Sequence, residues 1–139
     1  MPTRLNPYLN FRTEAREAMT FYQSVFGGEL NMSSFGDYGM SDDPAEKDKI
    51  MHAQLEAPDG LVLMGADTPS SMEFSRGTDI SVSLSGEDEA ELRGYFEGLS
   101  NGGTVTAPFE KAPWGDTFGM FTDKFGINWM VNALGEQNA

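Results

Sequence analysis

Residues 13–35 have the sequence TEAREAMTFYQSVFGGELNMSSF. Thr13 has the residue type and position of a helix N-cap, so we expect the helix to begin after it. Gly27 and Gly28 are expected to end the helix, because glycine readily adopts the left-handed backbone of a helix carboxyl terminus. A strand is predicted over 29–35. The apolar residues between the two ends recur at helical spacing and predict one buried face, made by Ala15, Ala18, Met19, Tyr22, Val25 and Phe26.

Short apolar and alternating runs on both sides of this helix predict further strands. They cover residues 4–11, 49–57 and 61–66. Between the second and third predicted strands, residues 36–48 are polar, acidic and rich in turn-forming residues, which favours a solvated, mobile loop. The carboxylates of this loop lack the spacing of a calcium-binding loop.

The strand predicted over 49–57 alternates between two kinds of side chain. Because successive side chains of a strand point to opposite faces, we expect Met51, Ala53 and Leu55 to face the core. The same alternation leaves His52 and Gln54 together on the polar face.

The same order of elements then recurs. A strand is predicted over 78–85, with Ile80, Val82 and Leu84 facing the core, and a helix follows whose apolar face is Leu92, Phe96 and Leu99. Three more strands are predicted over 104–109, 116–122 and 128–133. A repeat at this period predicts two supersecondary units in one α+β domain, that is, two tandem βαβββ modules. We place them at about 3–67 and about 78–134, with a linker at about 68–77.

Composition restricts the class of protein. A chain of 139 residues with 39% hydrophobic residues is typical of one globular domain. No run approaches the roughly 20 apolar residues that cross a bilayer, and the first residues lack the apolar core of a secretory signal, so we expect no membrane partner and a cytoplasmic location. The 22 acidic and 9 basic residues give a net charge of −13, which disfavours nucleic acid as a partner. There is no cysteine, hence no disulfide and no thiolate metal site.

Three motifs spread along the chain carry a resemblance to a known family. The first is PYLNF at 7–11 followed by the helix end FYQSVFG at 21–27. The second is His52-Ala53 followed by LVLM at 61–64. The third is WGD at 114–116, followed by Gly119 and by DKFGINW at 123–129. Together they resemble the PhnB-like family of the glyoxalase/bleomycin-resistance/dioxygenase (vicinal oxygen chelate) superfamily.

The resemblance implies a fold and an assembly. Both modules would contribute to a curved, cup-shaped mixed sheet with the helices on its convex side, and the protein would be a homodimer. Some PhnB-like proteins carry a label that mentions 3-demethylubiquinone methyltransferase. This chain has no glycine-rich cofactor loop after its first predicted strand, so the sequence does not support that activity.

Metal-dependent members of the superfamily hold their ion on the first and fourth strands of each module. The matching positions here are Pro7, Met64, Asp79 and Met130. Proline has no ligand atom in its side chain, and a thioether is a weak ligand for hard divalent ions. We therefore expect neither a metal site nor a cofactor, although a divalent metal at an atypical site using His52 and Asp79 stays open.

His52 is the candidate catalytic or hydrogen-bonding residue, because histidine is the side chain that exchanges protons near neutral pH. The alternative is a structural histidine bonded to a neighbouring carbonyl. Trp114 could stack on a planar ligand or close the mouth of the sheet as an apolar plug. The residues expected on or near a ligand site are Pro7, Tyr8, His52, Gln54, Met64, Asp79, Ser81, Trp114, Asp116 and Met130.

The preferred function is the binding of a small organic molecule without chemistry. Two alternatives remain open: a lyase, isomerase or dioxygenase with an atypical metal site or with His52 as general base, and a non-catalytic assembly module.

Overall fold

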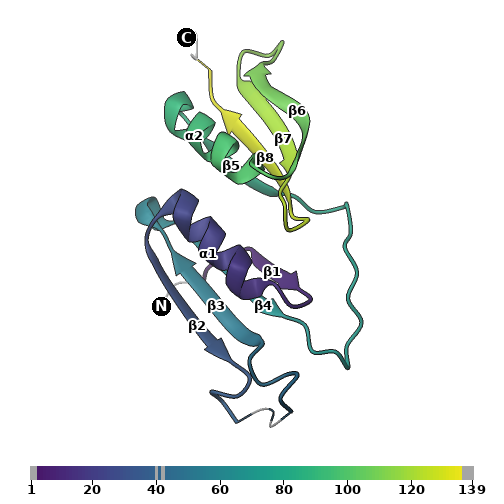
Figure 1. The fold of residues 1–139 in the computed structure, drawn as a ribbon. Helices are drawn as coiled ribbons and strands as arrows, with labels where there is room; N and C mark the ends of the chain where they lie inside the picture. Colours follow the sequence, from purple (N-terminus) through teal and green to yellow (C-terminus); the bar gives the residue numbers. More distant parts are fainter. Residues whose placement is uncertain (1–2, 40, 42, 136–139) are drawn as a thin grey trace. The chain divides into compact units, whose positions relative to one another are not determined.

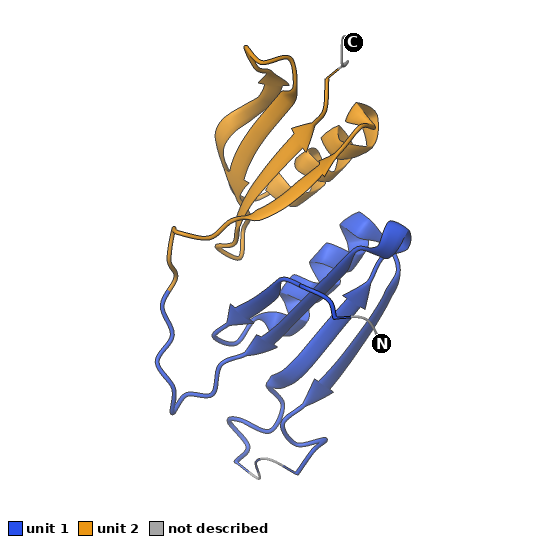
Figure 2. Ribbon diagram, turned by 180° about the vertical axis from the view of Figure 1, so that it is seen from behind, with its two compact units in different colours: residues 1–75 blue, residues 76–139 orange. Residues whose placement is uncertain are grey.

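The chain repeats one order of elements in two compact units, residues 1–75 and 76–139 (Figure 2). The structure is a computed structural model, and it describes residues 3–39, 41 and 43–135. Each unit is a four-stranded sheet with one helix lying along one face (Figure 1).

The first unit has its strands in the order β1-β4-β3-β2. Strand β1 runs parallel to β4, and the other neighbours are antiparallel. A one-turn 3-10 helix joins β3 to β4. The elements are β1 (Tyr8–Phe11), α1 (Ala15–Phe26), β2 (Glu29–Ser34), β3 (Ile50–Glu56), the 3-10 helix (Pro58–Gly60) and β4 (Val62–Asp67).

The second unit repeats this topology in the order β5-β8-β7-β6, again with one parallel pair, β5 with β8. The predicted α+β class and the two tandem βαβββ modules are therefore confirmed. The elements are β5 (Val82–Gly86), α2 (Glu89–Ser100), β6 (Thr104–Lys111), β7 (Thr117–Thr122) and β8 (Asn128–Ala133).

The predicted helix faces are largely confirmed, because helical spacing alone determines which side chains share a side. In α1 every predicted core residue except Val25 is buried, and Val25 is half-buried. In α2 the three predicted core residues are the three buried ones. Trp129 and Val131 of β8 are also buried against the helix side.

The predicted cap of α1 is wrong. Glu14, not Thr13, occupies the N-cap position, and its side chain makes no capping hydrogen bond. The carboxylate of Asp67, at the end of β4, takes this role instead. Its Oδ1 accepts from the Ala15 amide at 2.8 Å and its Oδ2 accepts from the Ile50 amide at 2.9 Å. One buried carboxylate thus joins the start of a helix to the start of a strand.

Two predicted inward-facing positions are also wrong. In β3 the register passes from His52, paired with Ser33, to Ile50, paired with Ser34, so that Met51 is bulged out of the ladder. Ile50 is buried as a result, and Met51 is only half-buried.

The second wrong position is Ile80. Strand β5 begins at Val82, so Ile80 precedes it and its side chain is 78% exposed.

The two glycine pairs after the helices share a structural reason. Gly27 and Gly102 have positive φ values of 76° and 82°, which L side chains rarely adopt. In the next position of each pair, a Cβ on Gly28 would collide with the backbone of Glu56, and a Cβ on Gly103 would collide with that of Thr122. The repeated glycine pair therefore lets the chain turn out of the helix and pass close to the neighbouring strand.

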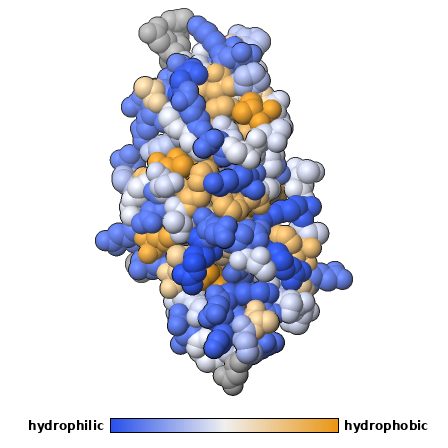
Figure 3. Space-filling model, in the orientation of Figure 1, coloured by the Kyte–Doolittle hydropathy of each residue, from blue (hydrophilic) through white to orange (hydrophobic). Residues whose placement is uncertain are grey.

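Hydrophilic side chains are spread over the face drawn in Figure 3, with smaller apolar patches between them. The most exposed large apolar residues are Leu5, Ile80 and Trp114. No helix in the described part of the chain is long and apolar enough to cross a membrane.

Candidate functional site

The face of the first sheet that points away from α1 carries four of the ten predicted ligand-binding residues, Tyr8, His52, Gln54 and Met64. Tyr8 of β1 pairs with Met64 of β4, Met64 pairs with Gln54 of β3, and Gln54 pairs with Asn31 of β2. These four side chains form one row across the sheet. The neighbouring row contains Gly65, where a Cβ would touch Met19 of α1, so the two rows face opposite sides.

Tyr8 and His52 meet on this face. The Tyr8 hydroxyl lies 3.3 Å from His52 Nδ1, and the two ring centroids are 5.8 Å apart. Burial raises the pKa of the Tyr8 phenol, so the phenol keeps its proton at neutral pH. In the tautomer that carries its proton on Nε2, the imidazole accepts a hydrogen bond from the Tyr8 hydroxyl at Nδ1 and presents Nε2–H as a donor.

The backbone around the pair explains its position. Pro7 precedes β1 and has no amide hydrogen to give to a sheet, but its carbonyl accepts from the Met64 amide at 3.1 Å. This bond helps to align β1 with β4 and so to place Tyr8. On the other side, the bulge at Met51 lies next to His52 and bends the strand at that point.

The resulting surface mixes three kinds of group within one sheet: the phenol–imidazole pair, the Gln54 amide and the Met64 thioether. His52, Gln54 and Met64 are half-buried, and 45% of Tyr8 is exposed. Such a set can donate to and accept from a polar ligand, while the thioether and the rings contact its apolar part. The imidazole can also exchange a proton.

The predicted site residues of the second unit lie in three places. Met130 is on the face of its sheet away from α2, between Ser83 of β5 and Met120 of β7. Asp79 lies before β5 and is exposed, and Ser81 immediately precedes that strand and is half-buried. The predicted strand over 78–85 begins later than expected, so neither residue belongs to the sheet.

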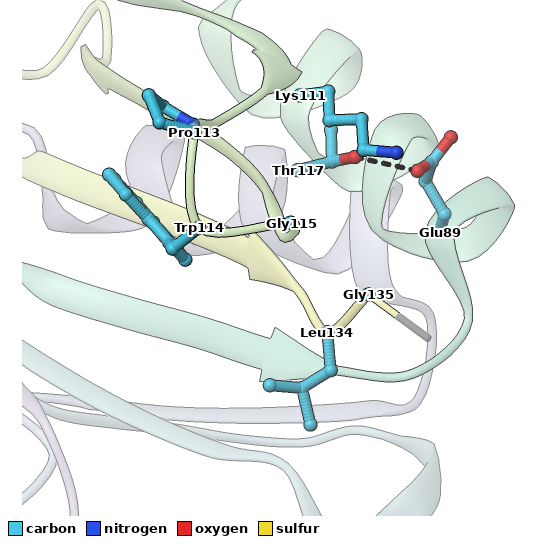
Figure 4. Close-up of a pocket in the computed structure, with 8 residues that line it drawn as sticks. All are labelled: Glu89, Lys111, Pro113, Trp114, Gly115, Thr117, Leu134 and Gly135. Carbon is cyan, nitrogen blue, oxygen red and sulfur yellow. Dashed lines mark hydrogen bonds between the residues drawn. The ribbon is translucent and has the colours of Figure 1, made fainter. Parts of the chain in front are cut away.

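Trp114 and Asp116 lie in the loop between β6 and β7. Trp114 lines a pocket of about 530 Å³ (Figure 4). Asp116 anchors the loop: the Gly135 amide, the Asn132 side chain and the Trp114 side chain donate to its carboxylate and lower its pKa. Most of the pocket could not be predicted from the sequence, because its residues come from α2, the ends of β6 and β7, the loop between these strands and the segment after β8. The lining residues are Glu89, Lys111, Pro113, Trp114, Gly115, Thr117, Leu134 and Gly135.

The residues present do not fit the metal site that the fold implies. The four positions carried over from metal-dependent proteins supply one carboxylate, from Asp79, two thioethers and a proline. That donor set does not suit a hard divalent ion. Among residues 3–39, 41 and 43–135, no three His, Asp or Glu side chains gather in a way that could hold a metal ion.

The predicted acidic loop is attached to the linker through Glu46. The Glu46 carboxylate accepts from the Ser70 amide at 2.8 Å and lies 2.7 Å from Lys49 Nζ. Lys49 first, and then Ser70, lower the pKa of Glu46 to about 2. Met40 and Asp42 of the same loop lie outside the described residues.

Comparisons with known proteins agree over nearly the whole chain. The model of a family described as 3-demethylubiquinone-9 3-methyltransferase matches residues 3–132. Protein PA1353 from Pseudomonas aeruginosa is 39% identical, with a TM-score of 0.84 over 97% of this chain and 100% of that one.

Two further solved structures share the fold. A PhnB protein from Bacillus cereus is 24% identical, with a TM-score of 0.75 over 95% of this chain and 100% of that one. A member of the glyoxalase/bleomycin resistance protein/dioxygenase superfamily from Sphaerobacter thermophilus is 21% identical, with a TM-score of 0.56 over 95% and 98%.

Proposed function

Because this chain belongs to the PhnB-like family described as 3-demethylubiquinone-9 3-methyltransferase, within the glyoxalase/bleomycin resistance/dioxygenase superfamily, we propose that it binds a small organic molecule without a metal. The ligand would lie on the face of the first sheet away from α1. The observation that carries this proposal is the Tyr8–His52 pair, with Gln54 and Met64 beside it.

The Tyr8–His52 pair leaves hydrogen-bonding groups for a ligand. The Tyr8 hydroxyl and the His52 imidazole lie within hydrogen-bond distance of each other. Here each has the other, so the second imidazole nitrogen is left for a ligand. Gln54 Nε2 donates to Glu56 Oε1 at 3.0 Å, which leaves the Gln54 side-chain carbonyl as an acceptor. The thioether of Met64, which adapts to the shape of its neighbour, would contact the ligand's apolar part.

The methyltransferase activity in the family's description is not part of the proposal. Strand β1 is followed by Arg12, Thr13 and Glu14, not by a glycine-rich turn into a helix. A loop of that kind is what brings the backbone close to a nucleotide cofactor.

The family suggests how the protein assembles, and its net charge suggests which ligands it accepts. We propose a homodimer acting in the cytoplasm, with a small organic molecule and not nucleic acid as its ligand, because a net charge of −13 repels phosphate. Sedimentation equilibrium would test the dimer, and a mass of one chain at micromolar concentration would contradict it.

The binding proposal is tested through the single histidine of the chain. In a ¹H–¹³C NMR spectrum His52 gives one imidazole Cε1–H signal, so a library of small organic molecules can be screened for compounds that move it. We expect at least one compound to shift this signal to saturation. Tyr8→Phe, which removes only the hydroxyl, should weaken that compound about two- to tenfold, the range of one hydrogen bond.

Tyr38→Phe is the matched control, because Tyr38 is 59% exposed and lies in the loop after β2. It should bind the same compound as the parent does. If no compound moves the His52 signal, or if the two tyrosine variants weaken binding equally, the proposed ligand surface is wrong.

One observation also favours a second candidate, an enzyme with acid–base chemistry. The 3.3 Å contact would let Tyr8 and His52 pass a proton between them. In that case His52→Ala should abolish turnover of a bound compound, whereas a binding protein should show no turnover to lose. Calorimetric titration of chelator-treated protein with Zn²⁺, Ni²⁺, Mn²⁺ and Fe²⁺ tests whether such an enzyme would depend on a metal. A metal-dependent enzyme should bind one of these ions stoichiometrically, and His52→Ala or Asp79→Ala should remove that binding.

A further inference from the structure

The loop pocket of the second unit has two chemically different ends. Figure 4 shows the Trp114 ring on one side of it, with Lys111, Thr117 and Glu89 gathered on another. Leu134, from the segment after β8, adds a second apolar side chain. The pocket volume of about 530 Å³ lies within the range in which proteins bind small molecules.

The two charged residues at the polar end, Glu89 and Lys111, differ in whether they have partners. Both oxygens of Glu89 are engaged: Oε1 accepts from the Thr117 hydroxyl at 2.7 Å, and Oε2 lies 3.6 Å from an Arg93 guanidinium nitrogen. Lys111, in contrast, forms no ion pair with any described acidic residue. Lys111 is thus the basic residue among those that line the pocket, and its ammonium is available to an anion.

The apolar end is held in place and is exposed. The side chain of Trp114 is 66% exposed and that of Leu134 is 44% exposed. The loop that carries Trp114 is closed by a hydrogen bond from the Gly115 amide to the Ala112 carbonyl, at 3.0 Å, and is anchored by Asp116. A large apolar ring fixed in an exposed position gains free energy when a flat ligand covers it.

We propose that this pocket binds a monocarboxylate with a planar apolar group. The ring of the ligand stacks on Trp114 and contacts Leu134, and its carboxylate pairs with Lys111.

The test uses the two tryptophans as paired reporters in the intact protein. The Trp129 indole is buried and donates to Asp123 at 2.9 Å, whereas Trp114 lines the pocket. Because their surroundings differ, we expect two separate indole N–H signals in a ¹H–¹⁵N spectrum, and Trp114→Phe assigns them. The probes are phenylacetate and 2-phenylacetamide, which have similar shape and differ in charge.

Phenylacetate should move the Trp114 signal to saturation and leave that of Trp129 in place. The neutral amide should bind about tenfold more weakly, the effect of losing one charge-assisted hydrogen bond. Lys111→Met should weaken phenylacetate by the same factor. Lys47→Met, the same change of charge on an exposed residue of the first unit, should not.

Three results would overturn the proposal: a Trp114 signal that phenylacetate does not move up to its solubility limit, equal affinity for acid and amide, or unchanged affinity in Lys111→Met. The residues that line the pocket all belong to the second unit, and none of them is part of the proposed ligand surface of the first unit. A failure of this test therefore would not contradict the proposed ligand surface of the first unit. In the same way, a failure of the His52 screen would not contradict the proposal for this pocket.

Discussion

Two buried aspartates, one in each unit, accept hydrogen bonds from several donors. Asp67 accepts backbone amides at the start of α1 and at the start of β3. Asp123 plays a comparable part in the second unit, where its Oδ1 accepts from the Phe125 and Ile127 amides and its Oδ2 accepts from the Trp129 indole. Both side chains are nearly fully buried, at 5% and 3% exposed. Buried carboxylates with several donors replace the water they lose by hydrogen bonds inside the fold.

We predict that Asp67→Asn lowers the free energy of unfolding by about 1–3 kcal/mol, the cost of a buried donor left without an acceptor. An amide can accept from one of the two backbone N–H groups, but its NH₂ group must face the other. Urea unfolding followed by circular dichroism measures the change.

Asp59→Asn is the control for that measurement. Asp59 lies in an exposed turn at a φ of 65°, a conformation that asparagine adopts as readily. A loss of stability in Asp59→Asn as large as in Asp67→Asn would refute the capping role.

Prediction at the residue scale succeeded where neighbours in sequence decide the outcome. Alternation along one strand was enough to place His52 and Gln54 on a face away from the buried Ala53 and Leu55. It failed for the cap of α1, because the carboxylate that binds the Ala15 amide is 52 residues away in the sequence. No local pattern marks such a partner.

At the scale of elements, each unit is a helix packed on a sheet, and small residues determine how closely the two approach. Gly119 of β7 lies on the helix side. A Cβ there would be 2.6 Å from Cε2 of Phe96 in α2 and 2.8 Å from Cα of Phe109 in β6. Real Cβ atoms do not approach that closely, so the glycine is required by packing and not by a turn.

We predict that Gly119→Ala destabilises the protein by about 1–3 kcal/mol, the range for an overfilled core. Gly94→Ala should have the opposite sign. Gly94 is exposed within α2 and a Cβ there meets nothing within 4 Å, so alanine should raise stability by about 0.5–1 kcal/mol through helix propensity. The measurement is the midpoint of thermal unfolding of each variant. A change of the same sign in both midpoints would contradict the packing role of Gly119.

The boundaries of elements were predicted less well than their number and order. Strand β8 has the predicted bounds, whereas β1 and β5 begin four residues later than expected, at Tyr8 in place of Arg4 and at Val82 in place of Thr78. Both are edge strands with one partner each. An edge strand extends only as far as its single neighbour supplies hydrogen bonds. Its own sequence therefore does not determine where it begins.

At the scale of the whole molecule, charge is the dominant feature. The chain has 22 acidic and 9 basic residues, so the folded protein concentrates a net charge of −13 in a small volume. Unfolding separates these charges, and self-repulsion therefore favours the unfolded chain.

We predict that added NaCl at pH 7 raises the midpoint of thermal unfolding. Salt screens charges over a Debye length of about 10 Å at 0.1 M, which weakens the repulsion between acidic side chains. The measurement is a series of thermal transitions from about 0.01 M to about 0.3 M ionic strength, with a transition at pH 5 as a control, where fewer carboxylates are charged and the salt effect should be smaller. A midpoint that falls or stays constant with salt at pH 7 would show that repulsion does not limit stability.

The sequence by itself determined the α+β class, the two βαβββ modules, the buried faces of both helices and the family, because each follows from the period of apolar residues or from short motifs. Tertiary structure alone decided the rest. It paired Tyr8 with His52, brought the Asp67 carboxylate to α1 and gathered Glu89, Lys111 and Trp114 around one pocket. The physical reason is that hydrogen bonds and pockets depend on distances between segments far apart in the chain, and strand pairing and helix packing determine those distances.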